Sequence, residues 1–180
     1  DTGAIVGAGV IMVADRHGAG EWRGDDGLAL VARLRALAPG ALIICAGAAQ
    51  TDLVETFVRE RDGDRRRIAG SAPEALRSAL TAMACLETGA APADVSLAAI
   101  GRPPKEMFVP WEGAAIGGSR AADVLPAAVI ARIDRQVPYL WPPGPLALAG
   151  AAVRVARLVT GRAPGWVNVF LVPPVESGPR

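Results

Sequence analysis

The pair of side chains best suited to ligand chemistry is Glu74 and Arg77, which follow Pro73 in a segment with helical spacing. Residues three apart lie on the same face of a helix, so this carboxylate and this guanidinium can interact. One interpretation is a surface ion pair of small energetic value. The guanidinium also presents a planar fork of donors that matches the two oxygens of a ligand carboxylate. The residues alone leave both interpretations open.

Few residues of this chain are suited to metal binding or thiol chemistry. His17 is the only histidine, and Cys45 and Cys85 do not form a Cys-x-x-Cys pair. A zinc site built from Cys and His is therefore not expected, and no metal site is predicted. Both cysteines stand in apolar runs and are predicted to be buried, reduced thiols, as in a cytoplasmic protein. His17 is interpreted as a solvated residue of a Gly-rich loop.

A possible dinucleotide fingerprint begins at Gly7-Ala8-Gly9. That motif needs a strand, a tight glycine turn and then a helix whose N-terminus faces the pyrophosphate. The third glycine position holds Met12, and the apolar run that ends at Val13 is typical of a strand rather than a helix. We therefore expect a plain strand here. The alternative, a flavin or NAD protein built on these glycines, requires a helix that begins at Val10.

Composition and charge describe a globular protein without a strongly charged partner. Apolar residues make up 51% of the 180 residues, and the net charge is +1. This balance gives no reason to expect nucleic acid or an anionic membrane as a partner. The uncharged apolar run 3–14 is too short to span a bilayer, and the run 139–153 is broken by prolines. No signal peptide is expected, since no basic segment precedes an apolar one.

The elements that must position these residues alternate between strands and helices. Strands are expected at 9–13, 41–46, 95–100, 107–110 and 166–172. Helices are expected at 28–37, 52–61, 73–88, 126–135 and 146–159. The first half is typical of a parallel α/β layer and the second of an α+β layer.

Read in this order, the segments resemble the lactate/malate dehydrogenase family. Residues 5–13 are similar to the family's fourth strand, and 39–48 to the next strand, which in the family ends in Asn-Pro. Residues 67–71 resemble the segment before the substrate helix, and Pro73-Glu74-Ala75-Leu76-Arg77-Ser78 looks like the family's Leu-Asp-x-x-Arg-Ser. Residues 99–110 match the histidine loop and its strand, and 146–172 resemble a late helix and strand.

The resemblance implies an α/β fold: the end of a Rossmann-like parallel sheet followed by an α+β region like the family's C-terminal domain. Residues 1–70 would be the remaining part of the nucleotide-binding domain, and 71–180 the catalytic-domain-like region. About 70 residues of the cofactor half would precede Asp1, a figure scaled from ordinary domain sizes. The family's closing helices would follow Arg180. We accordingly expect a fragment of a longer protein.

The resemblance also assigns roles to single positions. Glu74 matches the family's catalytic aspartate, while Arg77 and Arg23 match arginines that hold the substrate. Ala14 and Gly47, at the ends of two strands, match positions near the cofactor, which in the family is NAD. Arg23 has a second interpretation, that of a solvated loop residue.

At two positions, this chain has residues that cannot perform the roles that the family's catalytic histidine and substrate-binding asparagine have. The catalytic histidine falls at Pro103, which has no titratable side chain, and the asparagine of Asn-Pro falls at Gly47. The sequence therefore predicts a divergent protein without ordinary dehydrogenase activity that binds a small carboxylate and forms a homo-oligomer. The alternative is an active NAD-dependent oxidoreductase on an unusual 2-hydroxy or 2-keto acid. Its acid/base would be relocated to a residue such as Lys105 or Glu106.

Overall fold

A three-stranded parallel sheet forms the centre of the first half of the chain. The computed structural model describes residues 3, 5–16, 20–60, 63–103 and 106–173. The strands β1 (Val10–Val13), β2 (Leu42–Cys45) and β3 (Ile68–Gly70) lie in the order β1-β2-β3. They are short apolar runs, as expected of strands that are covered on both faces.

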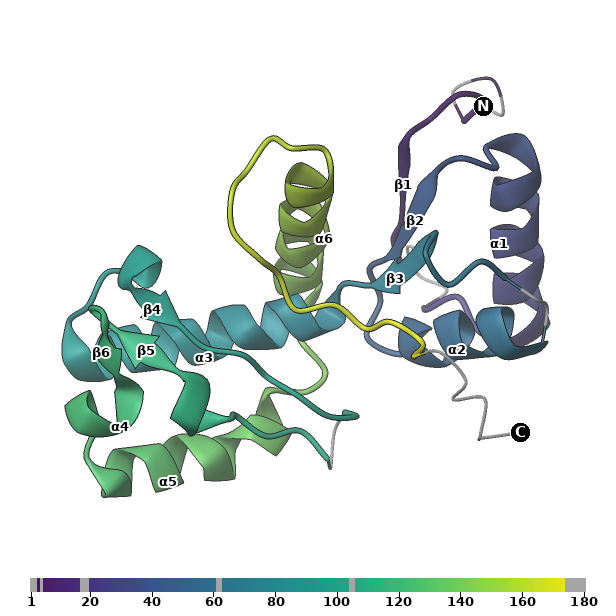
Figure 1. Cartoon of the computed structure of the whole chain (residues 1–180). Coiled ribbons are helices and arrows are strands. Elements are labelled where there is room, and N and C mark those ends of the chain that lie inside the picture. Colours follow the sequence, from purple (N-terminus) through teal and green to yellow (C-terminus); the bar gives the residue numbers. More distant parts are fainter. Residues whose placement is uncertain (1–2, 4, 17–19, 61–62, 104–105, 174–180) are drawn as a thin grey trace, which may run out of the picture.

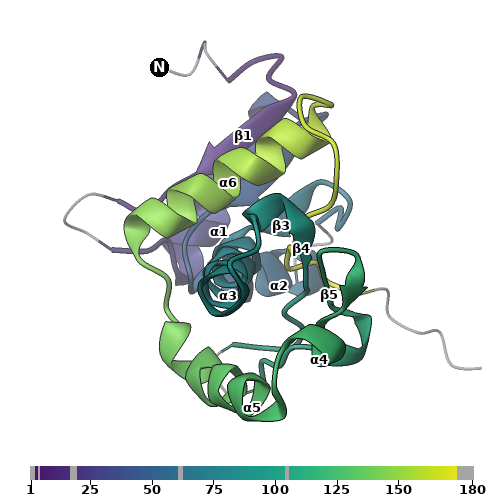
Figure 2. The same cartoon turned by 90° about the vertical axis from the view of Figure 1, so that its left-hand side faces the viewer.

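Helices cover both faces of this sheet (Figures 1 and 2). Helices α1 (Gly24–Leu37) and α2 (Gln50–Glu60) pack on one face, and α6 (Pro145–Val159) packs on the other. Successive side chains of β2 point to opposite faces. Ile43 accordingly joins the core beneath α1 and α2, whereas Ile44 packs against α6.

Helix α3 (Ala72–Thr88) carries the chain out of the sheet and positions Glu74 and Arg77. It begins two residues after β3, with Pro73 in its first turn, where the missing N–H costs no helical hydrogen bond. It ends at Gly89, whose φ of +71° is a left-handed conformation that glycine adopts without strain. Helix α3 packs against α6 where the two helices cross, and α3 runs on from the sheet into the second half of the chain (Figure 1).

The second half is a small antiparallel sheet against helices. The strands β4 (Val95–Ser96), β5 (Ala115–Ile116) and β6 (Ser119–Arg120) lie in that order. The helices are α4 (Ala121–Val124), α5 (Ala127–Gln136) and the 3₁₀ turns η2 (Pro92–Asp94), η3 (Trp111–Gly113) and η4 (Val137–Leu140). Their shared core includes Leu80, Trp111 and Ile133.

The alternation of strands and helices confirms the expected α/β class, and all five expected helices are present. A helix that begins at Val10 is wrong: β1 occupies that position and pairs with β2 in parallel register. The dinucleotide fingerprint at Gly7-Ala8-Gly9 therefore lacks the helix it needs.

Three expected strands are shorter than predicted or absent. Only Val95 and Ser96 of 95–100 pair as a strand, and 107–110 contributes a single bridge between Phe108 and Ile100. The segment 166–172 contributes one bridge, from Phe170 to Gly70. Pro110 cannot donate to a ladder, and the backbone N–H of Asn168 is used by a side chain instead.

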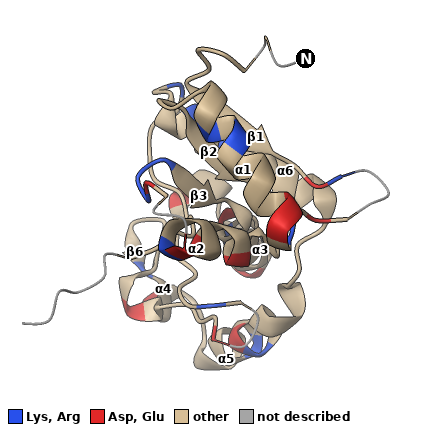
Figure 3. Cartoon of the chain, turned by 90° about the vertical axis from the view of Figure 1, so that its right-hand side faces the viewer, with Lys and Arg blue, Asp and Glu red and all other residues tan. Residues whose placement is uncertain are grey.

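Charge is mixed over the surface. Figure 3 shows acidic and basic residues together on α1, α2 and α5. Within the described part of the chain, no helix has the length and apolar character needed to cross a bilayer.

Candidate ligand-binding site

Glu74 and Arg77 form a buried ion pair. The Glu74 side chain is 0% exposed and that of Arg77 is 11% exposed. Arg77 donates from Nε to Glu74 Oε2 over 2.8 Å and from Nη2 to Oε1 over 2.6 Å. Such a two-pronged contact is the strongest geometry available to these groups. The interpretation as a surface ion pair is therefore wrong, because neighbouring elements cover the pair.

Two further groups bind the Glu74 carboxylate. The backbone N–H of Asn168 donates to Oε2 over 2.9 Å, and Nε of Arg154 lies 3.2 Å from Oε1. The amide of Asn168 also donates from Nδ2 to the carbonyl of Ala99 over 2.6 Å. Glu74 thus joins helix α3 to α6 and to the segment after it. A buried carboxylate needs such donors, because an unpaired charge in the interior is costly.

The guanidinium of Arg77 is enclosed by this arrangement. Two of its three nitrogens are committed to Glu74, and the Trp166 ring lies 5.3 Å from its central carbon, within cation–π range. The edge of the fork formed by Nε and Nη2 is consequently occupied by an internal carboxylate.

Pro103 lies on a tight loop between Ile100 and Phe108. The loop is closed by two backbone hydrogen bonds of 2.9 Å between those residues. Gly101 has a φ of +112°, and a Cβ there would overlap the backbone carbonyl oxygen of Glu106. The conformation of the loop therefore requires glycine at this position.

A small cavity opens beside Pro103. It has a volume of about 160 Å³. Seven residues line it: Ala48, Ala49, Thr51, Asp52, Arg102, Pro103 and Trp141. Of these described residues, the charged ones are Asp52 and Arg102, and none is a histidine. The cavity thus brings together the two positions, Ala48 and Pro103, that the sequence matched to the asparagine and histidine segments of the family.

Gly47 stands where two polar side chains meet. Gln50 donates from Nε2 to Oδ1 of Asp15 over 2.8 Å, and a Cβ on Gly47 would overlap Asp15 Oδ1. Gln50 is fully buried, and its Oε1 has no hydrogen-bond partner among the described residues. Ala14 lies at the end of β1, and its carbonyl accepts a 3.1 Å hydrogen bond from the indole of Trp22. Both predicted cofactor positions therefore lie at the carboxyl edge of the parallel sheet.

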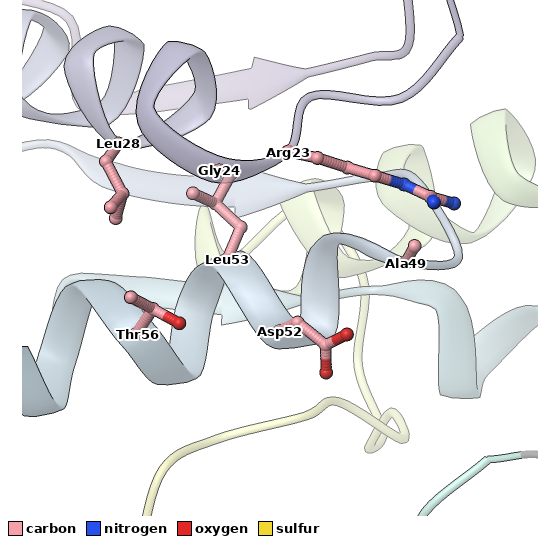
Figure 4. A pocket seen from close by; sticks show the side chains of 7 residues that line it. All are labelled: Arg23, Gly24, Leu28, Ala49, Asp52, Leu53 and Thr56. Atoms are coloured by element: carbon pink, nitrogen blue, oxygen red, sulfur yellow. The ribbon is translucent and has the colours of Figure 1, made fainter.

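Arg23 lies at a different cavity. A hollow of about 380 Å³ between α1 and α2 is lined by Arg23, Gly24, Leu28, Ala49, Asp52, Leu53 and Thr56 (Figure 4). Figure 4 shows the Arg23 side chain extending from the start of α1 toward Ala49. Arg23 lies 3.4 Å from Glu21, whose carboxylate accepts a 2.8 Å hydrogen bond from the Ala49 backbone. Arg77 lines neither this hollow nor the cavity beside Pro103.

Several residues of the site were missed by sequence reasoning. Arg102 lies next to Pro103, and Arg154 and Asn168 bind Glu74. The one signal available was the position of Arg102 in Gly101-Arg102-Pro103. His17 and Lys105 lie outside the described residues. Among the described residues, no group of three or more His, Cys, Asp or Glu side chains could hold a metal ion.

Comparison with known proteins is informative at the level of structure. No family model matches the chain, and no curated protein matches its sequence. Solved dehydrogenases match it closely in fold. The lactate dehydrogenase of Cryptosporidium parvum, solved with lactic acid and β-nicotinamide adenine dinucleotide, has a TM-score of 0.72 at 20% identity. That match covers 87% of this chain and 56% of the other.

Two further structures agree. The malate dehydrogenase of Aeropyrum pernix has a TM-score of 0.78 at 13% identity and covers 97% of this chain. MGS-M5, a lactate dehydrogenase from a deep-sea metagenome library of the Medee basin, has a TM-score of 0.73 at 14% identity and covers 95%. This chain spans 61% and 62% of their lengths. The chain therefore has the fold of the C-terminal region of the lactate and malate dehydrogenases.

Proposed function

We propose that this chain is part of a divergent lactate/malate dehydrogenase-like protein that binds a small carboxylate and lacks ordinary dehydrogenase activity. The observation that most directly supports the loss of activity is the buried pair of Glu74 and Arg77. It stands where the family resemblance implies a catalytic carboxylate and a substrate arginine, yet the two side chains bind each other.

Reduction of a 2-keto acid requires a group that gives a proton to the substrate oxygen. Pro103 cannot do so. The group must also be oriented by an acid, and Glu74 already accepts hydrogen bonds from Arg77 and Asn168 and forms an ion pair with Arg154. Its oxygens are therefore engaged with structural partners rather than available to a base. These features favour loss of the ordinary mechanism.

Binding of a small carboxylate is proposed because the family resemblance matches Arg77 and Arg23 to arginines that hold the substrate. Arg77 keeps Nη1 outside its pair with Glu74, and Arg23 is exposed at the start of α1. The cavity beside Pro103, at about 160 Å³, is smaller than the roughly 300–1,000 Å³ of pockets for drug-sized ligands. A compact acid suits it better than a larger molecule.

The second candidate is an active NAD-dependent oxidoreductase on an unusual 2-hydroxy or 2-keto acid. Asp52 favours it, because this carboxylate lines the cavity and is titratable. Glu106 lies on the same loop as Pro103 and is exposed. Either would have to replace the missing histidine as the proton donor.

NAD is proposed as the cofactor of the whole protein. Ligands of open parallel sheets bind outside the carboxyl ends of the strands, where Ala14 and Gly47 lie. NAD would supply hydride chemistry, while these residues would bind it.

The remaining proposals concern the whole protein. We propose a cytoplasmic homo-oligomer. Cys45 and Cys85 are both free, as in a reducing compartment, and α6 exposes Leu146, Val153 and Val159. Residues 1–70 would belong to the cofactor domain and 71–180 to the substrate domain.

The test is the oxidation of NADH by the full-length protein with pyruvate and with oxaloacetate. The proposal expects no turnover above background. Turnover at ordinary enzyme rates would favour the second candidate.

A further inference from the structure

Arg102 differs from Arg77 in how it uses its donors. A single nitrogen of Arg102, Nη2, lies 2.7 Å from Glu55 Oε2 and 3.4 Å from Asp52 Oδ1. Arg77 instead commits both Nε and Nη2 to one carboxylate. The ion pairs of Arg102 therefore leave Nε and Nη1 unused. Its side chain is 54% exposed, so a ligand can reach these donors.

The backbone around Arg102 is held in place. Gly101 adopts a conformation that only glycine tolerates here, and Pro103 fixes its own φ. The carbonyl of Arg102 accepts a 3.0 Å hydrogen bond from the N–H of Glu106. These contacts restrain the backbone at Arg102, which reduces the entropy lost when a ligand binds.

Arg102 also lines two adjoining cavities. One is the cavity beside Pro103, and the other has a volume of about 310 Å³ and is lined by Asp52, Glu55, Thr56, Arg59, Glu60 and Arg102. Asp52 and Arg102 are common to both. Among the described residues that line the cavity beside Pro103, Arg102 is the single cation, Thr51 contributes a hydroxyl and Trp141 an apolar wall.

We propose that Arg102 is the residue that holds the carboxylate of the ligand in the cavity beside Pro103. This inference rests on the proposed function, since it assumes that the protein binds a small carboxylate. A planar fork can receive two carboxylate oxygens, and Arg102 has unused nitrogens with which to do so. Asp52 opposes the ligand, because its negative charge repels the carboxylate and competes for Nη2.

The opposing effects of Asp52 and Arg102 give the proposal a distinctive test. Binding of malonate to the full-length protein is measured by calorimetry, with the neutral malonamide as the second probe. We expect Arg102→Gln to weaken malonate binding by about 10-fold or more, the ordinary effect of losing hydrogen bonds to a charged group. Arg102→Lys should weaken it nearly as much, because an ammonium cannot form the fork. Asp52→Asn should strengthen it, and malonamide should not bind.

The matched control is Arg120→Gln, which removes an exposed arginine that pairs with Asp123 on β6 and α4. It should leave malonate binding unchanged. Circular dichroism of each variant checks that it is folded. If the wild type binds malonate and Arg102→Gln binds it equally well, Arg102 is not the residue and the proposed function still stands. If the wild type does not bind malonate, carboxylate binding is rejected and this inference with it.

Discussion

The backbone N–H of Asn168 donates to the carboxylate of Glu74 over 2.9 Å, a contact between residues 94 positions apart. It connects the segment after α6 to the first turn of α3. The same carboxylate holds Arg77. A position that the family resemblance assigns to catalysis thus acts as a junction between distant parts of the fold.

This junction predicts a large stability loss for Arg77→Ala. The substitution leaves the fully buried Glu74 without its main partner, and breaking a buried pair in this way costs about 3–5 kcal/mol. Urea unfolding of the wild type and the variant measures the change. The double variant with Glu74→Gln should recover part of the loss, because the uncompensated charge is gone. A loss below about 1 kcal/mol for Arg77→Ala would show that the pair behaves as a surface pair.

Gly101→Ala should also destabilise the protein. The added Cβ would overlap the carbonyl oxygen of Glu106, and a non-glycine residue at a φ of +112° is strained. Strain of this kind costs about 1–3 kcal/mol before any clash is counted. Gly113→Ala is the control, because a Cβ there meets nothing within 4 Å and φ is not positive. Equal unfolding midpoints for the two variants would contradict the loop geometry described here.

Cys45 should resist thiol reagents in the folded protein. It is fully buried, and burial raises the pKa of its thiol to about 12. A raised pKa leaves the group neutral at pH 8, and the thiolate is the reactive form. Brief treatment with iodoacetamide at that pH, followed by peptide mass spectrometry, should modify Cys85 and spare Cys45. Denaturant should make both reactive. Rapid labelling of Cys45 in the native protein would show that β2 is not buried as described.

Much of the fold could be predicted because its signals are local. The runs that became β1 and β2 are apolar and short, and prolines and glycines mark the ends of α3 and α6. The start of α1 was placed at Leu28 instead of Gly24, because Gly24-Asp25-Asp26 has no apolar periodicity. Asp25 and Asp26 suit the first turn of a helix, where the helix dipole favours acidic side chains. These two aspartates therefore indicate the earlier start of α1.

The site could be predicted only in part. The spacing of Glu74 and Arg77 implies their contact, but their burial depends on Trp166, Asn168 and Arg154, which come from distant segments. Hydrophobic periodicity predicts local helices and strands, but it does not predict contacts between distant segments. The ion pair between Arg102 and Glu55, 47 residues apart, could not be predicted from the sequence for the same reason.

The strand predicted at 166–172 does not form, because a side chain competes for one of its backbone donors. Alternating apolar residues favour a strand there, and Phe170 does pair with Gly70. The N–H of Asn168 goes to Glu74 instead of to a neighbouring strand, so the ladder does not continue.

The most direct test of the central claim is the rate of NADH oxidation by the full-length protein with pyruvate or oxaloacetate. A positioned general acid/base contributes about 10²–10⁴ in rate, and Pro103 cannot act as one. We expect a rate indistinguishable from that of the reaction without protein. Saturable turnover at ordinary enzyme rates, about 1–10³ s⁻¹, would contradict it and show that another residue supplies the proton.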